Sequence, residues 1–526
     1  MTDRALLTEQ LDAGLALHRQ GKLLEAAQHY LAVLALDPQH GEALKLLAVV
    51  ALDRGELARA ADFAAAALAV QPRSGEYFHL LGRIKIRQGD LHAASRYLNN
   101  AVDAGAPEQG QALLDLSACL AKLKAWPQSL ASALRAIEAD PSNELSHRLA
   151  GHACFALDRH EEAVSYFEHV LAQDASQHSL WHLTSVSLLR LGRPIEAYER
   201  AAKACALVDG NADYAYQRRS AAAAAVPDWH FNMVNDEPRN AAFSTAIARV
   251  VKPEHRVLEI GTGSGLLAML AARAETGETR AAQVVTCEAN PLLARIAKQI
   301  VAANGLADRV SVVAKPSSEL QLGADLPGKA DVLICEIFSV QVIAEGVLPT
   351  LEDAKARLLA PHATVIPSAA IARGALVSSD ELARRTRVGS VHGLDLSALN
   401  EYTPTVQYLS SEQSLALLSA PTDLLRFELA HSDHFLAEKR AVQLNVTASG
   451  LCQGVVQWLR LELCANVDFE NQPGSAEAAT SRHWQPVFYP FAEPISVSVG
   501  ELVTVRVSHN RSGMHVMLEG AASNKR

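Results

Sequence analysis

The sequence predicts a multidomain protein of the class α + α/β + β, in which helical repeats precede a parallel-sheet domain and a strand-rich domain. A 34-residue period runs through residues 1–211, strands and helices alternate across 244–367, and strand-like segments dominate 368–526. Residues 212–243 read as a connector with further helices. A chain of 526 residues also exceeds what a single hydrophobic core normally holds, so we expect two to four domains.

Composition excludes several classes of protein. Hydrophobic residues make up 49% of the chain and charged residues 20%, as in globular proteins and unlike disordered ones. The net charge of -10 argues against a general nucleic-acid binder, which would carry a basic face. No stretch reaches the roughly 18 to 20 unbroken apolar residues of a membrane span, and the N-terminus does not read as a signal peptide. We therefore expect partners other than nucleic acid or membrane.

The seven cysteines are scattered, odd in number and never spaced as Cys-x-x-Cys. This pattern fits reduced thiols and gives no sign of a zinc site. The sequence therefore predicts a cytoplasmic protein without a bound metal.

The first part of the chain repeats small residues at fixed spacing. Its six units end near Pro38, Pro72, Pro107, Pro141, Ala175 and Asp209. Each unit has one small residue and a second twelve positions later, where two helices must touch: Gly14 and Ala26, Ala48 and Ala60, Gly82 and Ala94, Ser117 and Ser129, Gly151 and Ala163, Ser185 and Ala197. This pattern resembles the tetratricopeptide repeat, an α-solenoid whose concave surface usually holds a peptide or a protein. A spacer or a dimerisation arm is the alternative role.

A glycine-rich turn follows the first predicted strand, which ends at Ile260. The turn contains Gly261, Gly263 and Gly265. Such glycines let the backbone approach a ligand at the carboxyl end of a strand. Dinucleotide enzymes carry Gly-x-Gly-x-x-Gly here, whereas this chain has Leu266 in place of the last glycine. Its form, Glu259-x-Gly-x-Gly, resembles the first motif of the Rossmann-like methyltransferases that use S-adenosylmethionine (SAM). NAD binding and an inactive pocket are the alternatives.

Two further segments extend the predicted nucleoside site. The next strand ends in Glu288, 23 residues after Gly265, which is suited to accept both hydroxyls of a ribose. The third strand leads to Ser317, and the following Ser318 and Glu319 are expected at the adenine edge. The alternative is a helix start, with serine caps and an acid in the first turn.

The fourth predicted strand ends in Glu336, and Glu345 follows nine residues later. A guanidinium has delocalised lone pairs, so its nitrogens are poor nucleophiles. Two carboxylates can hold this flat cation by charge-assisted hydrogen bonds, draw positive charge away from the attacking nitrogen and aim its lone pair. The pair therefore suggests methylation of a guanidinium. Alternatively, Glu345 caps a helix and Glu336 pairs with a surface arginine.

From Val226 to its end, roughly 300 residues of the chain resemble the protein arginine methyltransferases. Glu336 and Glu345 match the double-glutamate loop of that family. Pro367 falls at the junction to the family's β-barrel, and 393–400 resembles the insertion from which a dimerisation arm emerges. The resemblance implies a barrel over 368–526, an arm near 388–404 and a homodimer.

The resemblance also implies roles for single residues. Met233 would pack beside the transferred methyl, and Arg239 would bind the carboxylate of SAM. Asp236 would pair with His483, and this pair would help to carry off a proton after transfer. Trp484 would belong to the Thr-His-Trp loop that closes over the substrate arginine. Arg482 replaces the threonine of that loop, which leaves the number and arrangement of the added methyls open.

The leading hypothesis is an enzyme that uses SAM, releases S-adenosylhomocysteine and methylates arginine in a protein or peptide recruited by the repeats. The combination resembles the repeat-bearing subgroup of the family. Two alternatives remain: a methyltransferase of a small guanidino or amino compound, and an inactive scaffold built on the repeats.

Overall fold

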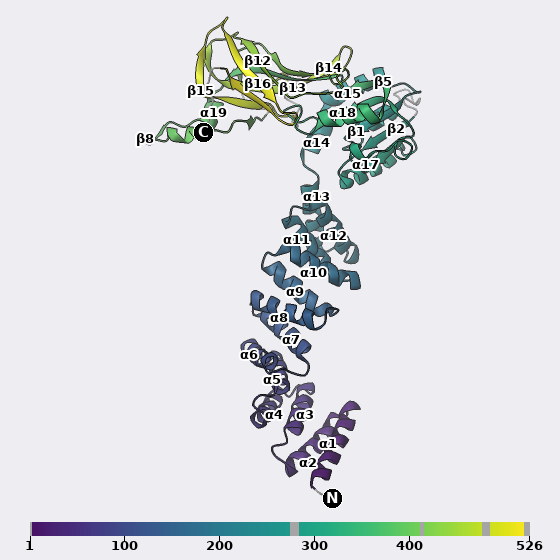
Figure 1. Ribbon diagram of the computed structural model, residues 1–526, viewed down its shortest axis with the longest axis vertical. Helices are drawn as coiled ribbons and strands as arrows, with labels where there is room; N and C mark the ends of the chain where they lie inside the picture. Colours follow the sequence, from purple (N-terminus) through teal and green to yellow (C-terminus); the bar gives the residue numbers. More distant parts are fainter. Residues whose placement is uncertain (1–2, 274–282, 411–414, 476–483, 520–526) are drawn as a thin grey trace. The chain divides into compact units, whose positions relative to one another are not determined.

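The computed structural model describes residues 3–273, 283–410, 415–475 and 484–519. The chain divides into two compact units, Met1–Ala225 and Val226–Arg526. Figure 1 shows the first unit from purple to blue and the second from teal to yellow. The predicted three-part fold class is confirmed, because helical repeats, a parallel sheet and antiparallel sheets follow one another along the chain.

The first unit is built from helix pairs. Its helices are α1 (Asp3–Arg19), α2 (Leu23–Leu36), α3 (Gly41–Asp53), α4 (Leu57–Val70), α5 (Gly75–Gln88), α6 (Leu91–Asp103), α7 (Gln109–Lys122), α8 (Trp126–Ala139), α9 (Glu144–Ala156), α10 (His160–Gln173), α11 (His178–Arg190), α12 (Pro194–Leu207) and α13 (Ala212–Ala225). The first twelve form the six predicted pairs. The last, α13, packs on α12 and α11 and donates from Gln217 Nε2 to Ser185 Oγ over 3.2 Å. The segment 212–225, expected in the connector, is thus part of the helical unit.

Small residues bring the two helices of each pair into contact, as the spacing predicts. A Cβ on Gly82 would lie 2.6 Å from Leu98, and one on Gly151 would lie 2.6 Å from Phe167. Ser117 Oγ and Ser129 Oγ each donate to the main-chain oxygen of the other residue at 2.9 Å. The positions twelve apart therefore mark the line along which two helices touch.

The second unit begins with a five-stranded parallel sheet in the order β3-β2-β1-β4-β5. Its strands are β1 (Arg256–Ile260), β2 (Gln283–Cys287), β3 (Val310–Val313), β4 (Ala330–Cys335) and β5 (Leu359–Ile366). The helical segments before and between them are α14 (Trp229–Val234), α15 (Glu237–Val250), α16 (Leu266–Ala272), α17 (Pro291–Ala303), η1 (Ser317–Glu319) and α18 (Val347–Arg357). The strand order reverses between β1 and β4, and ligands bind at such a switch point in open α/β sheets.

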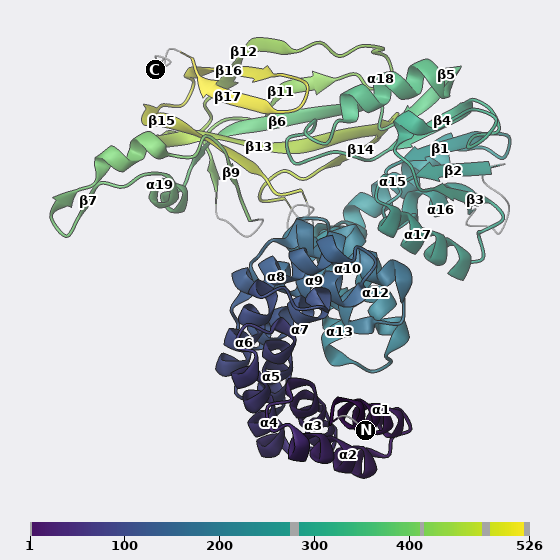
Figure 2. The ribbon, with the colours of Figure 1, turned by 60° about the horizontal axis from the view of Figure 1, so that its bottom comes forward.

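Antiparallel strands follow after residue 368 (Figure 2). They are β6 (Ala369–Ser378), β9 (Gln407–Tyr408), β10 (Ala416–Leu417), β11 (Thr422–Phe427), β12 (Glu438–Asn445), β13 (Gly450–Cys464), β14 (Val467–Glu470), β15 (Val487–Val497), β16 (Leu502–His509) and β17 (Met514–Leu518). One sheet has the path β10-β6-β13-β15-β9, with β11 beside β6 and β14 beside β13, and a second has the order β12-β16-β17. The antiparallel domain is confirmed, whereas the strand pairs of the described residues do not close a barrel.

A small projection lies where the arm is expected. Helix α19 (Asp380–Thr386) is followed by the hairpin β7 (Ser390–Val391) and β8 (Leu394–Asp395) and by η2 (Ser397–Tyr402). The side chain of Asn400 bonds to the main-chain nitrogen and oxygen of Val388, which closes the base of the projection. Within the described ranges, every helix is too short or too polar to cross a membrane.

Candidate active site

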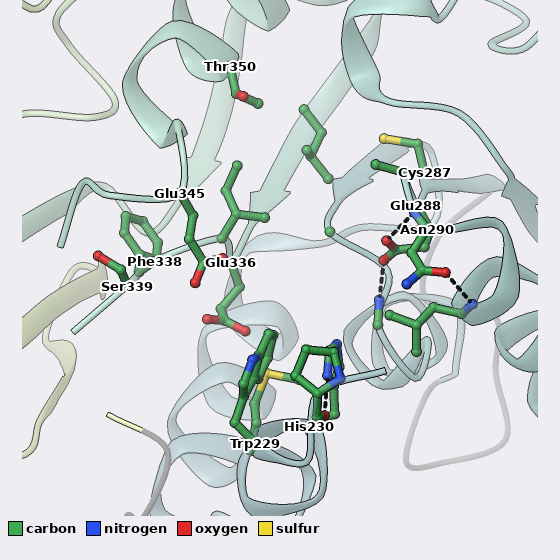
Figure 3. A pocket seen from close by; sticks show the side chains of 18 of the residues that line it. Trp229, His230, Cys287, Glu288, Asn290, Glu336, Phe338, Ser339, Glu345 and Thr350 are labelled. Carbon is green, nitrogen blue, oxygen red and sulfur yellow. Dashed lines mark hydrogen bonds between the residues drawn. The ribbon is translucent and has the colours of Figure 1, made fainter. Parts of the chain in front are cut away.

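A cavity of about 650 Å³ opens at the carboxyl ends of the parallel strands (Figure 3). Its lining includes Trp229, His230 and Met233 of α14; Cys287 at the end of β2; Gly261, Gly263, Glu288, Asn290, Lys315 and Ser317 after β1, β2 and β3; and Glu336, Phe338, Ser339, Val340, Glu345, Thr350, Tyr408 and Trp484. In Figure 3, Glu288 and Asn290 lie on one side, and Glu336 and Glu345 on the other. The cavity thus joins the predicted nucleoside site to the predicted guanidinium site.

Gly261 and Gly263 of the glycine turn between β1 and α16 line the cavity. Gly261 has φ of 92°, and a Cβ there would lie 2.5 Å from Ile337 Cγ2. At Gly263 a Cβ would meet Met233 Cε at 3.6 Å. Gly265 has φ of 82° and precedes α16, and it does not line the cavity. The left-handed backbone conformation at this position favours glycine, and Gly265 is the N-cap residue of α16.

Glu288 is held by main-chain donors. Its Oε2 accepts from Gly263 N over 3.0 Å, and its Oε1 accepts from Asn290 N over 2.9 Å. Each carboxylate oxygen can accept a further bond, so two neighbouring hydroxyls can be bound at once. This arrangement fits the ribose of SAM.

Arg239 lies next to a small cavity lined also by Met233 and Glu336. Its side chain is 3% exposed, and its guanidinium donates from Nη2 to Glu336 Oε2 and from Nη1 to Asn240 Oδ1. Among the described residues, Arg239 Nε is a buried donor without an acceptor. Since a buried donor without a partner is unfavourable, this position fits an anionic group such as the carboxylate of SAM.

Asp236 and Glu259 are buried and do not line the main cavity. Asp236 is fully buried, and its Oδ1 accepts from Arg239 N at the start of α15. Glu259 is 1% exposed and accepts a hydrogen bond from the Thr286 hydroxyl. Burial raises the pKa of Glu259 to about 8. The carboxyl of Glu259 thus borders the small cavity beside Arg239 rather than the main one.

Glu336 and Glu345 direct their carboxyl groups into the same space (Figure 3). Glu336 follows β4 directly. Glu345 precedes Gly346, which occupies the N-cap position of α18 and provides no side-chain hydrogen bond to the helix. The pKa of Glu345 is raised by burial and then by the negative charge of Glu336. Of the two alternatives, a helix cap by Glu345 is not found, and the arginine that pairs with Glu336 is the buried Arg239. Two neighbouring carboxylates with space between them favour a cationic ligand.

The loop between the two glutamates is tied to the antiparallel sheet. Trp484 is 3% exposed, and its Nε1 donates to Phe338 O over 2.8 Å. Gln457 Nε2 donates to Val340 O over 3.1 Å. Gln341 Nε2 donates to the hydroxyl of Tyr489 over 3.0 Å. The sequence contains no motif that marks Gln457, Tyr489 or Gln341, since only the packing of the two sheets brings them to this loop.

Two predicted adenine-site residues do not line the cavity. Ser318 and Glu319 are exposed and outside the lining of the cavity, whereas Ser317 is buried and lines it. Burial of Ser317 within η1 turns the next two side chains toward solvent. His483 falls outside the described residues. Across the ranges that the structure covers, no group of three or more His, Cys, Asp or Glu side chains is arranged to hold a metal ion.

Known families match both parts of the chain. A family model described as "Ribosomal protein L11 methyltransferase (PrmA)" matches residues 244–383, which include the whole parallel sheet. Models of the tetratricopeptide repeat match 11–75, 79–144 and 147–177.

Individual proteins resemble about half of the chain. An arginine N(omega)-methyltransferase of Streptomyces achromogenes subsp. streptozoticus is 38% identical over 284 residues, which cover 54% of this chain and 76% of that protein. Protein arginine N-methyltransferase 7 of Oryza sativa subsp. indica is 29% identical, covering 55% of this chain and 44% of that protein. The chain therefore spans less than half the length of the rice protein.

One solved structure is the Trypanosoma brucei PRMT1 enzyme-prozyme heterotetrameric complex with AdoHcy. It aligns at 22% identity with a TM-score of 0.48, covering 56% of this chain and 93% of that chain.

Proposed function

The chain belongs to the family of arginine N-methyltransferases, and we propose that it transfers methyl groups from SAM to the guanidinium of arginine. The observation that carries this proposal is the pair Glu336 and Glu345, which line one cavity together with the nucleoside-binding turn. A cation between two carboxylates, beside a methyl donor, is what the reaction requires.

The cofactor of this family is SAM, and its methylsulfonium supplies an electrophilic methyl. We propose that Arg239 holds the carboxylate of SAM, that Glu288 holds the ribose and that Met233 lies beside the methyl. These roles are supported by the buried free donor of Arg239, by the fixed carboxylate of Glu288 and by the 3.6 Å between Met233 Cε and a Cβ on Gly263. No metal is part of the proposal.

The two glutamates would bind and polarise the substrate. Because Glu336 Oε2 accepts from Arg239, its other oxygen can accept from the guanidinium, and Glu345 can accept from a second nitrogen. The carboxylates would draw the positive charge toward themselves and leave a lone pair on the attacking nitrogen. With SAM bound, this nitrogen would be held to bond with the methyl carbon as the sulfur–carbon bond breaks and S-adenosylhomocysteine leaves. The proton released from the nitrogen would pass to Glu345 or to His483, which we propose to be oriented by Asp236.

We propose a protein or peptide as the substrate, with the repeats recruiting it and Trp484 covering the bound arginine. Repeats of this kind present long surfaces for extended partners. One observation favours a second substrate. The Streptomyces relative is named an arginine, not a protein arginine, methyltransferase, so free arginine or another small guanidino compound is the alternative.

The projection at 388–404 supports a homodimer. Its apolar side chains are open to solvent, among them Leu394 at 68% and Leu399 at 62% exposed. All seven cysteines are free thiols, which favours the reducing cytoplasm as the location.

Transfer from methyl-labelled SAM tests the proposed function. The full chain is incubated with a proteome extract and, separately, with free arginine. We expect label on protein, and a loss of at least about 100-fold in Glu345→Gln, because a carboxylate that stabilises the transition state is removed. Glu336→Gln is expected to lose transfer as well, but Glu336 also holds Arg239, so Glu345→Gln is the cleaner variant.

Asp308→Asn is the matched control. Asp308 is an exposed carboxylate of the same unit, two residues before β3 and thus at the opposite end of the parallel sheet, and its replacement should leave transfer unchanged. Label on free arginine alone would select the alternative substrate. SAM binding without transfer to either form of arginine would refute the enzymatic function and leave the scaffold hypothesis.

A further inference from the structure

The loop from Glu336 to Gly346 has little internal support. Its described internal bonds all lie within residues 339–344: Val342 N donates to Ser339 O over 2.8 Å, Ile343 N to Gln341 O over 2.9 Å and Ala344 N to Ser339 Oγ over 3.0 Å. Val342 is fully buried and has φ of 71°, a left-handed conformation that is unfavourable for a β-branched side chain. Such a conformation persists only when surrounding structure imposes it. The position of the two glutamates therefore depends on contacts from outside the loop.

Gln457 supplies one of these contacts from a rigid place. It lies in β13, the central strand of the seven-stranded sheet, where it is opposite Gly374 of β6 and Val487 of β15. Its side chain is fully buried. Side chains on central strands are positioned more rigidly than those on loops. The bond from Gln457 Nε2 to Val340 O thus connects the middle of the glutamate loop to a central strand of the antiparallel sheet.

Among the described residues, the bond to Val340 is the one hydrogen bond that the amide of Gln457 makes outside its own strand. Its Nε2 donates to two main-chain oxygens, those of Val340 and Trp458, which fixes which end of the amide is nitrogen. Its Oε1 is buried and has no donor among the described residues. A buried acceptor without a donor is unfavourable, and a methionine of similar volume would avoid it. The sheet alone therefore gives no reason for a glutamine here.

We propose that Gln457 is a positioning residue, which holds the glutamate loop through Val340 so that Glu336 and Glu345 face one substrate. The proposal rests on the proposed function for its catalytic consequence. Gln457 itself does not line the cavity, so it acts through the loop and not on the substrate.

Gln457→Met tests this role in the full chain, since it keeps the volume and removes the donor. We expect the amides of 336–346 to exchange hydrogen on the order of tenfold faster, and kcat to fall on the order of tenfold, because small displacements of reacting groups are costly. The Kd of SAM should stay within about twofold, because Glu288 and the glycine turn are held by other bonds. A merely structural role would lower thermal stability and SAM affinity together.

Gln453→Met is the matched control. Gln453 lies in the same strand and is 5% exposed, and its Oε1 accepts from Ser379 N, away from the glutamate loop. Its replacement should leave loop exchange and kcat unchanged. Wild-type loop exchange in Gln457→Met, or faster exchange with wild-type kcat, would overturn the proposal. If the wild-type chain transfers no methyl at all, the proposed function fails, while loop exchange still decides whether Gln457 holds the loop.

Gln457→Glu is the second variant, in case the methionine variant does not fold. A carboxylate accepts only, whereas a protonated carboxyl can donate to Val340 O. We expect loop exchange close to that of the wild type at low pH and faster than that of the wild type at high pH. If the loop exchange rate of Gln457→Glu, divided by that of the wild type, is the same at every pH, this result would contradict a role for the donated bond.

Discussion

The buried carboxyl of Glu259 makes the stability of the second unit depend on pH. Burial raises its pKa from 4.5 to about 8. The folded protein therefore binds this proton more tightly than the unfolded chain. The resulting stabilisation is complete below pH 4.5 and is lost as the pH rises to about 8.

We expect Glu259→Gln to remove this dependence. Between about pH 5 and about pH 8, its free energy of unfolding should rise relative to the wild type by about 3 kcal/mol, since one pKa unit corresponds to about 1.4 kcal/mol. Urea unfolding followed by tryptophan fluorescence at several pH values measures the difference. Glu237→Gln is the control, because Glu237 is exposed in the first turn of α15. Its free energy of unfolding should depend on pH in the same way as that of the wild type. Parallel curves for Glu259→Gln and the wild type would contradict the expectation.

At the residue level, the position of a side chain was predictable where chain order alone fixes it. Glu288 and Glu336 follow strands directly, and the carboxyl ends of parallel strands meet at one edge, so their shared cavity was predictable. The pairing of Arg239 with Glu336 was not predictable, because the two residues are 97 positions apart in the sequence. The contact of Gln457 was not predictable either, since it is one bond from β13 to a loop residue 117 positions away in the sequence.

Helix packing in the first unit depends on the absence of side-chain atoms at single positions. A Cβ on Gly151 in α9 would lie 2.6 Å from Cδ1 and Cε1 of Phe167, which is fully buried. Gly110 in α7 has no heavy atom within 4 Å of a Cβ. The same substitution therefore has opposite consequences at these two helical glycines.

We expect Gly151→Ala to lower the free energy of unfolding by about 1 to 3 kcal/mol, because the added methyl displaces a packed ring. Gly110→Ala should raise it by about 0.5 to 1 kcal/mol, because alanine restricts the unfolded chain and favours a helix. Urea unfolding followed by far-ultraviolet circular dichroism reports on the helices. A shift of both variants in the same direction would show that the contact with Phe167 does not limit packing.

Element-level prediction succeeded for the repeats and failed for one helix. The 34-residue period carries its own signal, because six units repeat the same small residues. Helix α13 has no such signal: its buried side chains are Tyr214, Gln217, Ala221 and Ala225, and a buried glutamine interrupts the apolar face. Among the described contacts, the bond from Gln217 to Ser185 accounts for the burial of this glutamine, and it forms when α13 packs on α11.

In the second unit, two sheets of different kinds contribute to one site. The parallel sheet places Glu288 and Glu336 at its edge, while β13, β15 and Trp484 hold the loop that leads to Glu345. The order of these sheets along the chain was predictable, because alternating strands and helices give way to strands alone. Whether the antiparallel strands close a barrel was not predictable, because closure depends on which edge strands pair.

The projection at 388–404 gives the last prediction, at the scale of the whole molecule. Val391, Leu394, Leu396, Leu399 and Tyr402 are between 42% and 78% exposed. Clustered apolar side chains of this kind mark an interaction surface, and a second copy of the chain is the partner in our proposal. The homodimer should therefore depend on these side chains and not on exposed leucines elsewhere.

We expect the double variant Leu394→Asp, Leu399→Asp to be monomeric, because four buried carboxylates would have to be desolvated in its dimer. Both side chains are mostly exposed, so each protomer should fold as before. Sedimentation equilibrium across a concentration series measures the change. Leu436→Asp is the control: this leucine is 82% exposed and lies outside the projection, so the dimer should persist. A wild-type chain that stays monomeric throughout the series, or a double variant that still dimerises, would remove the projection from the dimer interface.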